Sequence, residues 1–183
     1  MIVGVGGQGT LLASRILGNA VISQGYDVKV SEVHGMSQRG GSVVTYVRFG
    51  EKVYSPIIDE GEADVILAFE RLEAYRYLPY LKKGGKIIMN AQETNPMPVI
   101  IGAAKYPEGI TGKIAAAADL TEVDALKIAG ELGNPRVVNV VLIGVMARNT
   151  DIPYETWRRV VAETVPAKAL EVNLAAFDRG YGI

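Results

Sequence analysis

The chain begins with the sequence Met1-Ile2-Val3-Gly4-Val5-Gly6-Gly7-Gln8-Gly9-Thr10. The apolar residues at the start predict a short strand, and the glycines after it predict a tight turn. Apolar residues then recur at three- and four-residue intervals over 10–24, which predicts a helix that ends at Gly25. Residues 26–30 predict a second strand. Strand, turn, helix and strand form a βαβ unit, so we expect a Rossmann-like opening with parallel strands.

The rest of the chain continues this alternation of strands and helices. Residues 43–49 alternate in polarity, and Gly50-Glu51 predicts a hairpin with 52–55, so the sheet should be mixed. We further expect strands over 63–69 and 86–89, short apolar runs at 99–101 and 114–118, and helices over 70–81, 121–132 (from a capping box of Thr121 and Asp124), 137–148, 153–164 and 167–178. This pattern predicts one domain over residues 1–183, a three-layer α/β/α fold with a mixed, mainly parallel sheet and a helical C-terminal part.

Composition limits the class of protein. The chain has 183 residues, 49% hydrophobic and 21% charged, which are globular values that exclude a disordered chain. Its 19 basic and 20 acidic residues give a formal charge of −1, so no attraction to nucleic acid or to an anionic membrane follows. There is no signal-peptide pattern, and the apolar run 137–147 is broken by Asn139 and is shorter than the ~20 residues of a spanning helix. We expect a cytoplasmic protein.

The sequence has no cysteine and a single histidine, His34. Disulfides, thiol nucleophiles, cysteine-ligated zinc and iron–sulfur clusters are therefore excluded, and we predict no metal site. His34 lies near Glu32 and would suit a general base, but we favour a structural or interface hydrogen bond for a lone histidine in a glycine-rich loop. We assign no catalytic residue. The charged residues at 70, 71, 73 and 76 are expected to form a solvated helix face.

The glycine turn matches the pattern G-x-G-x-x-G between a strand and a helix. Glycines let an anion approach the backbone amides, and a helix N-terminus favours a phosphate. Glu32 follows the second strand, where a dinucleotide fold places its ribose-binding acid, so NAD or FAD binding is one interpretation. A turn that only allows close strand–helix packing is the other. Thr10 follows Gly9 where a P-loop would have lysine, which excludes a P-loop.

A second loop is rich in hydrogen-bond donors. Residues 31–42 contain Ser37, Gln38 and Arg39, followed by Gly40 and Gly41. Arginine, hydroxyls and backbone amides would serve an anionic ligand or a polar subunit interface. A solvated loop remains the alternative. Since both loops follow strands that we expect to be parallel neighbours, they should line the same edge of the sheet.

Together the two loops resemble the gamma module of 2-oxoacid:ferredoxin oxidoreductases. The resemblance is carried by residues 4–10 and 32–41, and it extends to the end of the chain through 139–144 and 171–181. It is greatest for the beta subunit of the indolepyruvate type, which is built from that module. One departure is the start of the chain, which begins directly at the first strand and is compatible with a few missing residues.

The resemblance implies a subunit of an enzyme that oxidatively decarboxylates a 2-oxoacid with coenzyme A to an acyl-CoA and reduces ferredoxin. Thiamine diphosphate and iron–sulfur clusters would belong to partner chains, and this chain would contact coenzyme A or the thiamine-bearing partner. The residues assigned to that contact are Gly6, Gly7, Gln8, Gly9, Thr10, Ser37, Gln38, Arg39, Gly40 and Gly41. Arg39 would make the charge-assisted contact.

The implied substrate is an aryl pyruvate such as indolepyruvate, although pyruvate, 2-oxoglutarate and branched 2-oxoacids use similar modules. The isolated chain should be inactive, and a homodimer of it is compatible with this interpretation. The alternative is a stand-alone NAD(P)-dependent oxidoreductase that uses the glycine turn and Glu32. Against it, the sequence offers no proton-relay set such as a Tyr-x-x-x-Lys pair.

Overall fold

The computed structural model describes residues 1–35 and 40–183. Its sheet has six strands in these residues, in the order β2-β3-β1-β4-β5-β6. The strands are β1 (Ile2–Val5), β2 (Asp27–His34), β3 (Ser42–Gly50), β4 (Ala63–Ala68), β5 (Leu81–Asn90) and β6 (Asp119–Val123). β1, β4, β5 and β6 run parallel, whereas β3 is antiparallel to both β1 and β2. The predicted mixed, mainly parallel sheet is confirmed.

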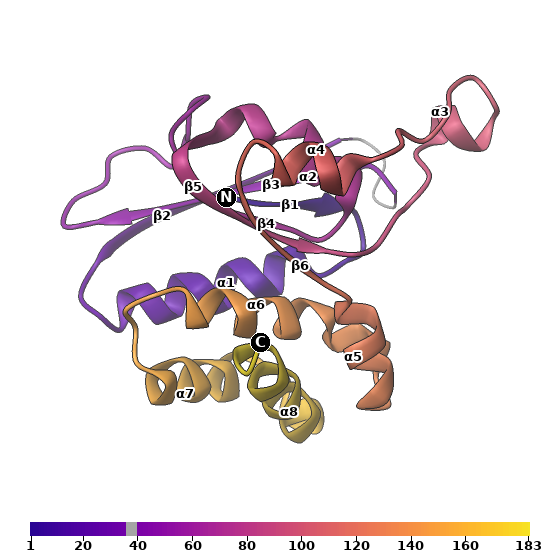
Figure 1. The fold of residues 1–183 in the computed structure, drawn as a ribbon. Coiled ribbons are helices and arrows are strands. Elements are labelled where there is room, and N and C mark those ends of the chain that lie inside the picture. Colours follow the sequence, from indigo (N-terminus) through magenta and orange to yellow (C-terminus); the bar gives the residue numbers. More distant parts are fainter. Residues whose placement is uncertain (36–39) are drawn as a thin grey trace.

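Helices cover both faces of the sheet (Figure 1). One face packs against α2 (Arg71–Arg76) and α4 (Ile110–Ala115), and the other against α1 (Thr10–Ile22) and α6 (Val138–Arg148). Side chains alternate along β1, so Ile2 joins the core on the α1 and α6 side and Val3 joins the opposite core. The predicted three-layer α/β/α arrangement is therefore confirmed.

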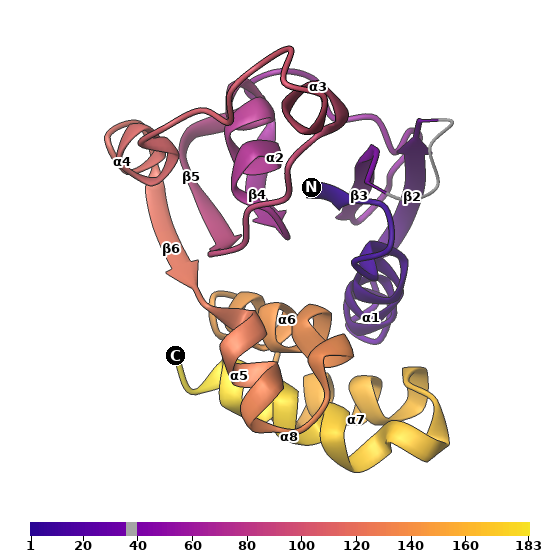
Figure 2. The same ribbon diagram turned by 90° about the vertical axis from the view of Figure 1, so that its right-hand side faces the viewer.

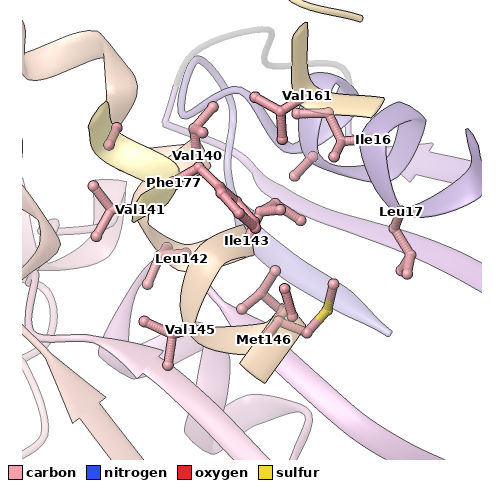
Figure 3. Close-up of a cluster of buried hydrophobic side chains, with 14 of the residues drawn as sticks. Ile16, Leu17, Val140, Val141, Leu142, Ile143, Val145, Met146, Val161 and Phe177 are labelled. Atoms are coloured by element: carbon pink, nitrogen blue, oxygen red, sulfur yellow. The ribbon is translucent and has the colours of Figure 1, made fainter. Parts of the chain in front are cut away.

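The C-terminal part adds helices outside α6 (Figure 2). They are α5 (Ala125–Glu131), α7 (Tyr154–Thr164) and α8 (Leu170–Tyr181). They cover the side of α6 that faces away from the sheet, which explains why residues 138–147 are all buried and why the helix is apolar all round (Figure 3). None of the helices in the described residues has the length and apolarity to cross a membrane.

The predicted hairpin paired β3 with the wrong segment. β3 pairs with β2 over the full register from Asp27↔Gly50 to His34↔Val43, and residues 52–55 form no strand. The β2 strand continues past the expected end at residue 30 because residues 31–34 pair with residues 46–43 of β3. In consequence β3 lies between β1 and β2, so these two strands are not neighbours in the sheet.

Two helices are shorter than predicted. Only Arg71–Arg76 of the expected 70–81 helix is α-helical, because Pro79 cannot donate a helical hydrogen bond; a 3-10 turn (Leu78–Tyr80) and then β5 follow. Of the expected 121–132 helix, Thr121 belongs to β6. Asp124 alone is the cap of α5, because its side chain accepts a hydrogen bond from the amide of Lys127 at 2.9 Å.

The two short apolar runs fall in or beside small helices. These are α3 (Met97–Ile100) and α4, and both lie in the connection between β5 and β6. The three C-terminal helices begin and end within a few residues of their predicted bounds.

Candidate functional site

The glycine loop, residues 6–9, follows β1 at the edge of the sheet where the parallel strands have their carboxyl ends. There it meets the loop that joins β2 to β3: the amide of Gly6 donates to the carbonyl of Gly41 at 2.9 Å, and the amide of Gly40 donates to Gly6 at 3.4 Å. The expectation that the two loops share an edge was based on neighbouring parallel strands. The structure brings Gly6, Gly40 and Gly41 together for another reason, since β3 starts beside the end of β1, at the register Val5↔Ser42.

Ser37, Gln38 and Arg39 were also assigned to the site. They lie outside the described residues, so the structure adds nothing about them. The candidate site is therefore built below from the glycine loop, the ends of the other loop and the strand ends around them.

Gln8 holds the glycine loop in shape. Its side-chain oxygen accepts a hydrogen bond from the amide of Val5 at 2.8 Å, and its side-chain nitrogen donates to the carbonyl of Phe69 at 3.3 Å. Its own amide donates to Val5 at 3.3 Å. The amides of Gly6 and Gln8 are thus engaged within the fold. By contrast, the amides of Gly7, Gly9 and Thr10 have no acceptor among the described residues.

Two glycines, Gly4 in β1 and Gly9 in the glycine loop, have too little space for a Cβ unless a neighbouring side chain moves. A Cβ added to Gly9 would lie 2.6 Å from the side-chain nitrogen of Asn139, and one added to Gly4 would lie 2.7 Å from the side-chain oxygen of Gln8. Gly7 has open space around it but a φ of 99°, and Gly9 has a φ of 83°, so both adopt the left-handed conformation that favours glycine.

Asn139 was not predicted to take part in the site. Its side-chain nitrogen donates to the carbonyl of Gly9 at 3.3 Å, and the residue is nearly fully buried. The start of α6 is thereby joined to the start of α1. The signal was present in the sequence, because Asn139 is the one polar residue that interrupts the apolar run 137–147.

Two carboxylates are buried beside this edge, after β4. Glu70 and Glu73 are only 1% and 3% exposed. Glu70 accepts hydrogen bonds from the Tyr106 hydroxyl at 2.5 Å, the Thr94 amide at 3.0 Å and the Glu73 amide at 2.9 Å, so it caps α2. The expected solvated helix face was therefore wrong for both glutamates.

Glu73 ties the second loop to α2. It accepts a 2.5 Å hydrogen bond from the hydroxyl of Ser42, the first residue of β3, and a 3.2 Å hydrogen bond from Arg76. Burial raises the pKa of Glu73, although Ser42 and Arg76 oppose that shift. The position of Gly41 beside Gly6 therefore rests partly on a buried carboxyl group.

The ends of β5 and β6 complete the edge. Asn90 is fully buried, donates to the Phe69 carbonyl at 3.2 Å and accepts from the Ala125 amide at 3.1 Å. Arg71 lies between Glu93 and Glu122, at 2.8 Å from each, in a pocket of about 450 Å³. Its charge is already balanced by two carboxylates, so this pocket does not favour an anion.

Another hollow, of about 600 Å³ and mostly apolar, lies by the amino ends of β1 and β4. It is at the opposite edge from the glycine loop. Its lining combines apolar side chains such as Leu17 and Phe49 with the charged residues Arg48, Glu62 and Asp64.

No group of three or more potential metal ligands occurs in residues 1–35 and 40–183. His34 is exposed at the end of β2, with Nδ1 3.3 Å from the carbonyl of the next residue, Gly35. Glu32 accepts from the Thr45 hydroxyl at 3.2 Å and is separated from β1 by β3. It is therefore not placed as the ribose-binding acid of a dinucleotide fold, in which the first two strands are neighbours.

These features define an α/β protein with a pre-formed glycine loop at the carboxyl ends of its parallel strands, without cysteine and, in the described residues, without a metal-ligand cluster. The chain belongs to the pyruvate ferredoxin/flavodoxin oxidoreductase family, whose model matches residues 1–183. This membership contradicts the alternative of a stand-alone NAD(P)-dependent oxidoreductase.

Individual relatives agree with the family. The chain is 47% identical to the indolepyruvate oxidoreductase subunit IorB of Pyrococcus horikoshii, over 98% of this chain and 92% of that protein. The gamma subunit of a keto/oxoacid ferredoxin oxidoreductase from Geobacter sulfurreducens has the same fold, with a TM-score of 0.72, 24% identity and coverage of 99% and 94%. The fold also matches a 2-oxoglutarate:ferredoxin oxidoreductase of Magnetococcus marinus, with a TM-score of 0.68, 19% identity and coverage of 99% of this chain but 30% of that one.

Proposed function

We propose that this chain is the small subunit of a heteromeric 2-oxoacid:ferredoxin oxidoreductase whose substrate is an aryl pyruvate such as indolepyruvate. The enzyme would decarboxylate the 2-oxoacid, transfer the acyl group to coenzyme A and pass two electrons to ferredoxin, in the cytoplasm. The observation that carries this proposal is the 47% identity to an indolepyruvate oxidoreductase subunit along 98% of the chain.

The proposed role of this chain is to bind coenzyme A or the thiamine-bearing partner through the glycine loop. The amides of Gly7, Gly9 and Thr10 lie at the N-terminus of α1, a helix of 13 residues, where the helix dipole favours a phosphate. Coenzyme A carries phosphates that suit such donors, and the related enzyme from Magnetococcus marinus has coenzyme A bound. Gly40 and Gly41 hold the second loop against the first, so Ser37, Gln38 and Arg39 are proposed to act at the same edge.

The redox and thiamine chemistry is proposed to belong to the partner chains. A chain without cysteine cannot supply thiolates to an iron–sulfur cluster. Thiamine diphosphate, when bound by the partner, would supply the carbanion chemistry of decarboxylation. The residues of this chain would orient the incoming thiol substrate or complete the partner's surface, and the isolated chain would be inactive.

Co-expression with the larger subunit tests this function. The purified complex should reduce ferredoxin or a viologen dye only when both a 2-oxoacid and coenzyme A are present, and fastest with aryl pyruvates in a panel that includes pyruvate, 2-oxoglutarate and branched 2-oxoacids. Failure of the two chains to co-purify, or activity that does not need coenzyme A, would contradict the proposal. A preference for another 2-oxoacid would contradict the substrate assignment alone.

The choice between coenzyme A and the partner is tested with Arg39→Ala in the same complex. Arg15→Ala, which removes the same charge from an exposed position of α1, is the control. Contact with coenzyme A predicts a KM for coenzyme A raised about tenfold or more, the change expected for loss of a charge-assisted hydrogen bond, with co-purification unchanged. Weaker co-purification, with an unchanged KM in the fraction of the complex that still forms, assigns the loop to the subunit interface instead.

A further inference from the structure

A small arm projects from the body of the molecule between β5 and α4. It comprises residues 95–104 and contains the four-residue helix α3, which stands away from the layers of the fold (Figure 1). Its backbone hydrogen bonds close within the arm, such as Ile100 to Pro96 at 3.1 Å and Ala103 to Pro98 at 2.8 Å. The arm is thus locally folded without support from the neighbouring elements.

The surface of this arm is apolar. Met97, Ile100 and Ile101 are 65%, 65% and 68% exposed, and residues 95–104 include no charged side chain, although 21% of the chain is charged. Burying an isoleucine side chain is favourable by about 1.5–3 kcal/mol of free energy. Three large apolar side chains exposed to water therefore raise the free energy of the isolated chain, and an interface that buried them would lower it. Exposed apolar groups gathered in one place mark contact surfaces in soluble proteins.

The arm lies at the same edge of the sheet as the candidate site. It follows β5, so it extends from the same carboxyl edge of the sheet as the glycine loop (Figure 1). Two further large apolar residues are exposed near that edge, Leu11 in the first turn of α1 and Leu126 in the first turn of α5. A stable interface takes about 800 Å² from each partner, contributed by roughly 20–30 residues, which is more than the arm alone supplies. A partner seated on the arm would therefore extend over this edge as well.

We propose that the arm is a docking anchor, which inserts Ile100 and Ile101 into an apolar groove on the larger subunit of the same oxidoreductase. This inference rests on the proposed function. It is supported by the Magnetococcus marinus enzyme, in which the same fold makes up only 30% of a longer chain and is therefore joined to a larger part of the same enzyme. The arm's lack of charge specifies an apolar groove rather than a charged patch.

The test uses the complete chain co-expressed with the tagged larger subunit. The variant Ile100→Asp/Ile101→Asp is compared with Ile22→Asp/Ile183→Asp, which places the same charges at two other exposed isoleucines, 56% and 52% exposed. We expect the arm variant to bind the larger subunit at least tenfold more weakly and the control to bind as wild type. Both variants should keep the wild-type melting temperature, because the substituted side chains lie in solvent.

A conservative variant separates apolar docking from damage to the arm. Ile100→Met/Ile101→Met keeps the apolar surface and should keep binding within about threefold. Wild-type binding by the aspartate variant would overturn the proposal. So would loss of a homodimer of the isolated chain with no effect on the larger subunit, since the occupant would then be a second copy. If wild type itself fails to bind the larger subunit, the proposed function fails rather than the role of the arm.

Discussion

The side-chain nitrogen of Asn139 donates a hydrogen bond to the carbonyl of Gly9, 3.3 Å away, across 130 positions of sequence. This contact joins the first turn of α6 to the glycine loop. With Gln8 bonded to Val5 and Phe69, and Gly6 bonded to Gly41, the loop is fixed from three sides. The loop therefore has its conformation before any ligand or partner arrives, which lowers the entropy that binding must overcome.

Gly9→Ala should destabilise the protein more than Gly7→Ala. Both glycines have positive φ, so both substitutions carry backbone strain of about 1–2 kcal/mol, but only the Cβ at position 9 meets Asn139, at 2.6 Å. We expect a further loss of about 1–3 kcal/mol for Gly9→Ala, measured by urea unfolding. In an Asn139→Ala background this excess should shrink toward zero. If the two alanine variants are equally stable in the wild-type background, Asn139 does not limit the loop.

Stability should depend on pH through Glu73. Because burial raises its pKa above the ordinary 4.5, the folded protein holds this proton more tightly than the unfolded chain. The stability that this contributes is fully present below about pH 4.5 and is lost as the pH rises through the raised pKa. Glu73→Gln keeps the shape of the side chain but does not titrate.

The expected result is that the free energy of unfolding of the wild type, relative to Glu73→Gln, falls as the pH rises above 4.5. Urea titrations between pH 4 and pH 8 measure it, roughly the range over which a raised carboxyl pKa acts. Glu60→Gln, at an exposed position, is the control for loss of one charge. A wild-type curve that stays parallel to that of Glu73→Gln would show that Glu73 has the same pKa in the folded and the unfolded protein, and would contradict the raised pKa.

Tyr106→Phe should lower the free energy of unfolding, because Tyr106 supports the N-terminus of α2. The Tyr106 hydroxyl donates to Glu70 at 2.5 Å and accepts from the Leu72 amide at 3.1 Å, and burial beside Glu70 raises the pKa of Tyr106, so the donor proton is retained. Removing it leaves a buried carboxylate with one donor fewer, at a cost of about 1–3 kcal/mol. Tyr54→Phe, at a side chain that is 88% exposed, should change stability by less than about 0.5 kcal/mol. Equal melting temperatures for the two variants would contradict this role.

The order of strands and helices was predictable because it follows from local patterns. The apolar spacing after Thr10, the buried run at 63–69 and the three C-terminal helices each depend on neighbouring residues, and the structure confirms them. The position of β3 between β1 and β2 depends on pairing between distant segments, which no local pattern encodes. The hairpin was assigned to residues 52–55 instead of β2 because the turn signal Gly50-Glu51 follows β3 directly, whereas β2 and β3 are joined by a longer connection, residues 35–41.

The candidate site was predictable only in part, for a similar physical reason. The glycine motif identified the loop, but the partners that fix it, Asn139, Phe69 and Gly41, are remote in sequence. Glu70 and Glu73 have a spacing typical of a solvated helix face. Their burial follows from Tyr106 and Ser42, which approach from other elements, and the sequence gives no sign of those contacts.

The contact between α6 and α8 should tolerate no side chain at its crossing point. A Cβ added to Gly180 would lie 2.0 Å from the carbonyl oxygen of Val141, and one added to Gly144 would lie 2.3 Å from the carbonyl oxygen of Phe177. These atoms are helix backbone and cannot move aside individually, so the helices must separate and open the core around Phe177. We expect Gly144→Ala or Gly180→Ala to lower stability by at least about 3 kcal/mol, the upper range for overpacking.

Gly130→Ala, exposed on α5 with nothing within 4 Å of the added Cβ, should be neutral or stabilising by up to about 1 kcal/mol. Thermal unfolding of the three variants measures the difference, and a melting temperature of Gly180→Ala equal to that of Gly130→Ala would show that the two helices do not approach each other this closely.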